Sequence, residues 1–137
     1  MMAPMVVVLL ATVLFGQAPP PEPEIPTARA LAEACRIWVD TKAERSAAGR
    51  NGAALTMSGN RCQREALMMM TSMQEKMEGM AGSGFCPPEP FWSAFDPAAT
   101  MAEAYLAYLD SRPALQNEAD GLTVFRAAMV QNWPCPR

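Results

Sequence analysis

Residues 96–113, DPAATMAEAYLAYLDSRP, contain the clearest helix signal in the sequence. Asp96 can cap the helix through its carboxylate, and Pro97 suits the first turn because that turn needs no backbone amide donor. The helix must end before Pro113, since the residue preceding a proline avoids the α region. Its apolar residues recur at helical spacing and define an inner face of Met101, Tyr105, Tyr108 and Leu109. The stretch therefore predicts an amphipathic helix.

The same spacing predicts two helices before this one. The first begins behind Pro26, with Thr27 as its N-cap, and runs to about Ser46. Its apolar face comprises Leu31, Cys35, Trp38 and Val39. The second starts near Asn60, where Gln63 takes the capping-box position. Its apolar stripe ends at a glycine-containing stretch and comprises Cys62, Ala66, Met69, Met73, Met77 and Met80.

One helix is predicted after it, from about Glu118 or Gly121 to Trp133, with Pro134 closing it. Its inner face comprises Leu122, Phe125, Met129 and Trp133. No segment alternates apolar and polar residues strongly enough to indicate a strand. The sequence therefore predicts an all-α fold, a small four-helix domain.

The N-terminus predicts export. Residues 6–15, VVVLLATVLF, form an apolar run that is too short to span a membrane, which takes about 20 apolar residues. Gly16 and Ala18 are small, as signal-peptide cleavage requires. We therefore expect a signal peptide at 1–18, a Pro-rich linker at 19–26 and a helical domain at 27–137. The mature protein is then expected in the periplasm, without a stable membrane anchor.

The sequence contains four cysteines, Cys35, Cys62, Cys86 and Cys135. An even number in a small exported domain indicates disulfides rather than free buried thiols. Three pairings are possible. We favour Cys35–Cys62 with Cys86–Cys135, because this pairing links successive helices and keeps both loops short. It predicts two disulfide-linked helical hairpins that pack face to face.

The composition excludes several classes of function. The chain has no histidine, which removes Ser-His-Asp and Cys-His catalysis, the usual zinc sites and c-type haem attachment. No pattern places the remaining carboxylates over a common cleft, so we expect neither an enzyme nor a bound cofactor or metal. Residues 19–85 carry eight acids and eight bases, whereas residues 86–137 carry six acids and three bases. This acidic balance argues against nucleic acid as a partner.

The methionines in residues 68–77 allow two interpretations. Soft thioethers select Cu(I), but methionine also fills gaps in cores and adaptable contact surfaces. Met69 and Met73 continue the stripe that Cys62 begins, which favours a core or interface over copper. Met68 points off that stripe, which predicts a wide apolar face for a partner helix or a second copy of the chain. The methionines concerned are Met68, Met69, Met70, Met73 and Met77.

Three connectors are candidate contact loops. Residues 85–95, FCPPEPFWSAF, are stiffened by prolines. Their aromatic residues either anchor a partner or pack at the base of the domain, and comprise Phe91, Trp92 and Phe95. Residues 111–120, SRPALQNEAD, form a polar, acidic connector with the contact candidates Arg112, Gln116 and Glu118. Residues 47–59 are small and glycine-containing, which is typical of a mobile loop.

The C-terminal half carries an ordered set of motifs. Cys86 and Pro88 precede a helix that ends in YLAYL (105–109) and is followed by Arg112-Pro113, and an Ala-rich helix then closes on WPCP (133–136). This order resembles the Tai-type or Rap-type immunity proteins, the type VI secretion amidase immunity family. The resemblance covers roughly residues 27–137 and is close from Cys86 onward. It departs after Cys62, where QREALM replaces the family's glycine-containing stretch.

The resemblance implies a small helical periplasmic protein, often dimeric, that protects its own cell. It would occlude the active-site cleft of a secreted peptidoglycan amidase delivered by a type VI secretion system, without doing chemistry itself. Size, leader, disulfides and the Met-rich face also suit a second class, a small periplasmic helical chaperone or stress protein.

Overall fold

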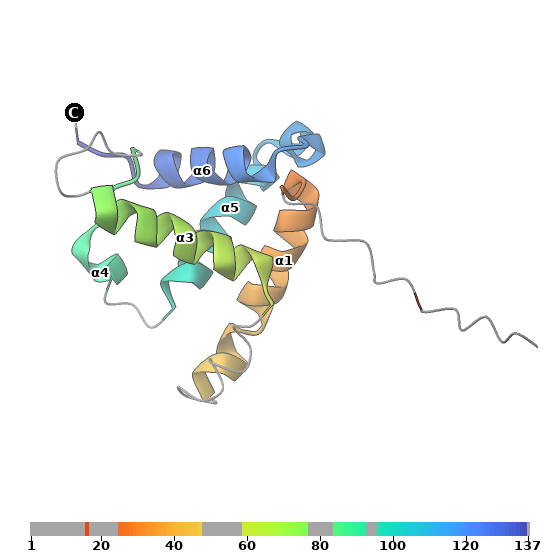
Figure 1. Ribbon diagram of the computed structural model, residues 1–137, viewed down its shortest axis with the longest axis horizontal. Helices are drawn as coiled ribbons and strands as arrows, with labels where there is room; N and C mark the ends of the chain where they lie inside the picture. Colours follow the sequence, from red (N-terminus) through yellow and green to blue (C-terminus); the bar gives the residue numbers. More distant parts are fainter. Residues whose placement is uncertain (1–15, 17–24, 48–58, 77–83, 93–95, 137) are drawn as a thin grey trace, which may run out of the picture.

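The computed structural model describes residues 16, 25–47, 59–76, 84–92 and 96–136. The predicted all-α, disulfide-linked fold is confirmed, with the pairs Cys35–Cys62 and Cys86–Cys135 as predicted. Nearly all of the predicted leader and most of the predicted linker lie outside the described residues. The elements, shown in Figure 1, are α1 (Ala28–Asp40), α3 (Arg61–Lys76), α4 (Glu89–Trp92), α5 (Pro97–Asp110), the 3-10 helix η1 (Pro113–Asn117) and α6 (Gly121–Asn132).

Four helices begin with a side-chain cap. In each, an oxygen of the cap residue accepts a hydrogen bond from the amide three residues further on, at 3.0–3.1 Å. These contacts satisfy backbone donors that the first turn of a helix leaves unpaired. The caps of α1, α3, α5 and α6 are Thr27, Asn60, Asp96 and Asp120. The predicted starts of these helices are therefore confirmed.

The first helix ends earlier than predicted. α1 stops at Asp40 rather than near Ser46, and residues 42–47 are helical again after a turn at Thr41. The Thr41 hydroxyl donates to the backbone carbonyl of Ile37 at 2.8 Å. A threonine that bonds back in this way bends a helix, which accounts for the interruption.

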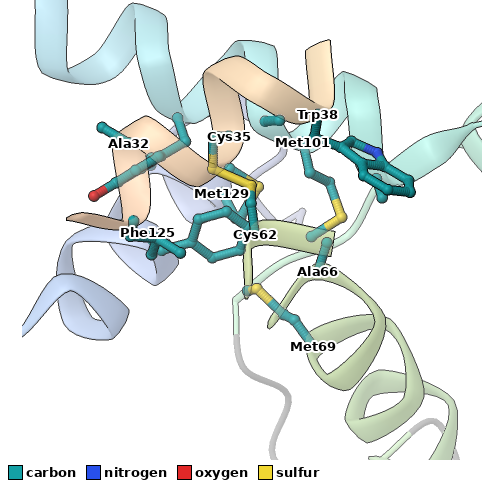
Figure 2. Packing of buried hydrophobic residues seen from close by; sticks show 14 of the residues in the cluster. Ala32, Cys35, Trp38, Cys62, Ala66, Met69, Met101, Phe125 and Met129 are labelled. Carbon is teal, nitrogen blue, oxygen red and sulfur yellow. A yellow bond between two sulfur atoms is a disulfide. The ribbon is translucent and has the colours of Figure 1, made fainter. Parts of the chain in front are cut away.

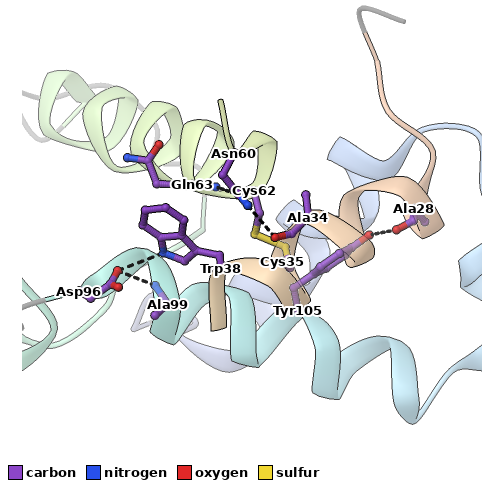
Figure 3. The surroundings of a disulfide bond; sticks show 10 residues. All are labelled: Ala28, Ala34, Cys35, Trp38, Asn60, Cys62, Gln63, Asp96, Ala99 and Tyr105. Carbon is purple, nitrogen blue, oxygen red and sulfur yellow. Dashed lines mark hydrogen bonds between the residues drawn. A yellow bond between two sulfur atoms is a disulfide. The ribbon is translucent and has the colours of Figure 1, made fainter. Parts of the chain in front are cut away.

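α1 is the central element of the packing. It contacts α3, α5 and α6, and α3 also packs on α5, so that both predicted hairpins contribute to one core (Figure 1). Figure 2 shows how side chains from these helices meet around the Cys35–Cys62 disulfide. The largest fully buried side chains include Leu31, Met101, Tyr105, Phe125 and Met129. Figure 3 shows the hydroxyl of Tyr105 donating to the carbonyl oxygen of Ala28 at 2.8 Å.

The second disulfide lies beside a short backbone pairing that the sequence did not predict. Phe85 and Pro134 form an isolated antiparallel bridge. The amide of Cys86 donates to the carbonyl of Trp133 at 2.8 Å. Gly84 has a φ of 82°, a left-handed conformation that glycine adopts without strain. The Cys86–Cys135 bond thus holds the segment before α4 against the segment after α6.

Candidate partner-binding surface

The predicted aromatic anchor Phe91 lies in the core. Its side chain is only 6% exposed, and its ring makes edge contacts with Phe85 and Trp133 at centroid distances of 6.0 and 5.2 Å. The structure therefore favours the packing interpretation over a contact role for this residue. Trp92 ends α4, but its side chain and the whole of Phe95 lie outside what the structure describes.

The consecutive methionines of α3 point in different directions. Met69 and Met70 are each 8% exposed, whereas Met68 is 60% exposed, which confirms that Met68 lies off the buried stripe. The side chain of Met73 and the whole of Met77 lie outside the described residues. Burial of Met69 and Met70 favours the core interpretation over copper binding.

The connector at 111–120 is ordered and docked on the start of α1. Its middle forms η1, closed by hydrogen bonds from Leu115 N to Arg112 O at 3.0 Å and from Glu118 N to Leu115 O at 3.1 Å. The carbonyl of Glu118 accepts from the amide of Ala28 at 3.0 Å, while its side chain is exposed. Gln116 is half-buried. These contacts fix the connector, which the sequence predicted as a polar, acidic candidate contact loop without indicating that it is ordered.

Gly121 allows this docking. Its amide donates to the carbonyl of Pro26 at 2.8 Å, and a Cβ at this position would lie 2.7 Å from the carbonyl oxygens of both Pro26 and Thr27. Both are backbone atoms, which have little freedom to move away. The N-terminus of α6 and the entry to α1 can therefore approach this closely only because residue 121 is glycine.

Arg112, one of the predicted contact residues, lies in the wall of a hollow between α5 and α6. The hollow has a volume of about 160 Å³ and an alanine-rich lining that includes Ala104, Ala107 and Ala128. The guanidinium carbon of Arg112 lies 4.2 Å from the ring centroid of Tyr108. Its amino groups donate to Ser111 Oγ at 2.8 Å and to Gln131 Oε1 at 2.9 Å. The structure thus assembles a cation, an aromatic ring and neutral polar groups around one cavity.

A second arginine site was missed by sequence reasoning. The side chain of Arg45 is 2% exposed, and its Nη2 lies 2.6 Å from Oδ2 of the Asp96 carboxylate. Its guanidinium carbon lies over the ring of Trp38, 3.6 Å from the ring centroid. Trp38 Nε1 donates to the same carboxylate at 3.2 Å (Figure 3). The available signal was the spacing of Trp38 and Arg45, seven residues apart and hence on one helix face. This site links the end of the first helical segment to the cap of α5.

Their surroundings shift the pKa values of Tyr105 and Asp120. Burial raises the pKa of the Tyr105 phenol, which keeps it protonated as the donor to Ala28. Hydrogen bonds from the backbone amide and then the hydroxyl of Thr123 lower the pKa of Asp120 from its ordinary value of 3.8. The exposed Asp120 is thereby held ionised as the cap of α6.

Among the described residues, no group of three or more His, Cys, Asp or Glu side chains gathers as in a metal site. No helix in the same part of the chain is long and apolar enough to cross a membrane. No known protein-family model, curated protein or solved structure matches the chain. Fold and disulfides define its class: an all-α, doubly disulfide-linked domain of an oxidising compartment.

Proposed function

We propose that this protein is a periplasmic immunity-type binding protein. It neutralises a peptidoglycan amidase toxin of a type VI secretion system by occupying the active-site cleft of that enzyme. The observation that carries the proposal is the ordered connector at 111–120, which holds Arg112 beside a hollow on the surface. The motif order from Cys86 to Cys135 supports it, because this order resembles the amidase immunity family.

A rigid contact surface suits a protein that acts by blocking the active-site cleft of an enzyme. A protein that blocks a cleft gains affinity when its contact surface is already ordered before binding, since less conformational entropy is lost. Here the C-terminal end of the connector is fixed against the entry to α1 by the Glu118–Ala28 hydrogen bond and, one residue beyond the connector, by the Gly121–Pro26 hydrogen bond. The absence of histidine in the sequence agrees with a role that requires no general base.

The test is a toxicity assay in cells. A peptidoglycan amidase encoded beside the gene is exported to the periplasm of a host, with and without the full-length chain. We expect lysis by the amidase alone and survival when both are present. An amidase variant without hydrolytic activity serves as the control and should cause no lysis. Continued lysis in cells that accumulate the oxidised, folded protein would contradict the proposal.

A second candidate function, a periplasmic chaperone, is favoured by exposed apolar side chains. Ile37 on α1 and Met68 on α3 are each 60% exposed. Such side chains can bind unfolded clients. A chaperone of the acid-activated kind should suppress client aggregation at low pH, whereas an immunity protein should remain folded and have no effect. Light scattering from an aggregating client therefore separates the two functions.

A further inference from the structure

We propose that the hollow between α5 and α6 binds the carboxylate of one aspartate or glutamate side chain of a partner protein, with Arg112 as the principal contact. The inference rests on the proposed function and names the chemistry of the contact. It places a hot spot of the interface on the C-terminal ends of α5 and α6.

Arg112 has hydrogen-bond donors that its contacts with Ser111 and Gln131 leave available. A guanidinium carries five N–H donors, and the side chain of Arg112 makes one bond to Ser111 and one to Gln131. Both acceptors are neutral. Among the described residues no carboxylate forms an ion pair with Arg112. The cation is thus held in place by neutral groups, and no described residue supplies its counter-charge.

The guanidinium group of Arg112 is already held in position before any partner binds. The guanidinium carbon lies over the Tyr108 ring at 4.2 Å from its centroid, and the hydrogen bonds to Ser111 and Gln131 hold both terminal nitrogens of the group. An arginine held in this way can offer its remaining donors as a planar fork, which matches the two oxygens of a carboxylate. Little side-chain entropy is then lost on binding.

The hollow has the volume of one side chain rather than of a whole small molecule. The hollow measures about 160 Å³, whereas pockets that hold whole small molecules are typically about 300–1,000 Å³. One side chain is the largest group that suits it. Its polar groups, including Gln131 and Asn132, surround an alanine-rich surface that can contact the methylene groups of a glutamate. Arginine and tyrosine are also the residue types enriched at interface hot spots.

The test is a titration of the oxidised, ¹⁵N-labelled protein, recovered from cells that export the full-length gene product. The probe is the capped peptide acetyl-Gly-Glu-Gly-amide, and its matched control is acetyl-Gly-Gln-Gly-amide. We expect the glutamate peptide to shift the Arg112 Nε–H and Gln131 side-chain amide resonances in a saturable way. The glutamine peptide should bind about tenfold more weakly or not at all, since it lacks the charge-assisted bond.

Variants locate the site. Arg112→Gln should abolish the saturable shift of the Gln131 amide, and Arg112→Lys should weaken binding because it keeps the charge but loses the planar fork. Arg126→Gln removes the same charge from an exposed position of α6 and should leave binding unchanged. Equal shifts with both peptides, or unaltered binding by Arg112→Gln, would overturn the proposal. Tighter binding of inorganic phosphate than of the glutamate peptide would also overturn it, in favour of a phosphate ligand.

The titration uses no amidase, so its outcome is independent of the toxicity assay. Binding of the glutamate peptide without protection of cells would retain the carboxylate site and contradict the immunity role. Protection without peptide binding would retain the immunity role and contradict this site.

Discussion

In the described part of the chain, two arginines lie over aromatic rings, and their surroundings differ in burial and in counter-charge. Arg45 covers Trp38, is almost fully buried and pairs with the Asp96 carboxylate. Arg112 lies over Tyr108 and is half-buried, and its side chain bonds to the neutral groups of Ser111 and Gln131. The first site carries its own counter-charge within the chain, whereas the second lacks one in the described structure.

The difference separates a structural role from a binding role. A buried cation without a partner costs several kcal/mol, so Arg45 and Asp96 are each required once the other is present. A half-buried cation keeps part of its hydration, so it is stable without a partner and remains available to bind an anion from outside the chain. We therefore expect variants at the Arg45–Asp96 site to affect stability and variants at Arg112 to affect binding.

The largest effect is expected from Asp96→Ala. This change leaves Arg45 buried without a counter-charge and removes both the cap of α5 and the acceptor for Trp38. We expect the free energy of unfolding to fall by about 3–5 kcal/mol, measured by urea denaturation of the oxidised protein. Asp110→Ala, at an exposed position of the same helix, should change it by less than about 0.5 kcal/mol. Equal losses from both variants would contradict the structural role of the Arg45 site.

Gly121→Ala should have the next largest effect on the free energy of unfolding. It tests how the C-terminal end of the connector 111–120 is held against the start of α1. The new Cβ would meet two backbone oxygens at 2.7 Å, so the start of α1 and the start of α6 must separate. We expect a loss of about 1–3 kcal/mol in the same denaturation experiment. Ala127→Ser adds one atom at an exposed position of α6 and serves as the control, with little change expected. Unchanged stability of Gly121→Ala would show that the docking seen here does not limit stability.

A smaller effect on stability is expected from Arg112→Gln. The variant loses one stacking contact and two hydrogen bonds at a half-buried position, where water can replace them. The free energy of unfolding should therefore change by less than about 1 kcal/mol. A loss as large as that of Asp96→Ala would make Arg112 a structural residue and remove the contrast between the two sites.

The smallest effect is expected from the cap of α6 and depends on pH. The pKa of Asp120 is lower in the folded than in the unfolded chain, so its contribution to stability is complete above the ordinary value of 3.8. That contribution is lost as the pH falls through the lowered, folded-state value. Asp120→Asn keeps a capping oxygen but does not titrate, so it should remove this part of the acid-induced loss. Denaturation curves in acid and at neutral pH measure the difference, and an identical pH dependence in both proteins would contradict the assignment.

The sequence predicted the local structure well, because caps, prolines and apolar spacing act over a few residues. Asp96 and Pro97 correctly predicted the start of α5, and Pro113 correctly predicted that it ends before residue 113. Of the three possible disulfide pairings, the sequence favoured the one with Cys35–Cys62, because it links successive helices and keeps the loops short, and this pair is confirmed.

Contacts between distant residues could not be predicted in the same way. The Arg45–Asp96 pair joins residues 51 positions apart, and the burial of Phe91 depends on Trp133 from the far end of the domain. No local pattern encodes either contact, because each depends on how whole helices are placed. The same limit applies to Arg112, whose residue type suggested a contact but whose hollow depends on alanines from both α5 and α6.

The most direct test of the proposed function is whether the purified, oxidised protein inhibits a peptidoglycan amidase of the kind proposed as its partner. Peptidoglycan hydrolysis is measured against increasing concentrations of the wild type, Arg112→Gln and Arg126→Gln. We expect the wild type to inhibit at about one protein per enzyme, Arg126→Gln to match it, and Arg112→Gln to inhibit at least about tenfold more weakly. An amidase that stays fully active in excess wild-type protein would contradict the proposed function, and equal inhibition by all three proteins would contradict the role of Arg112.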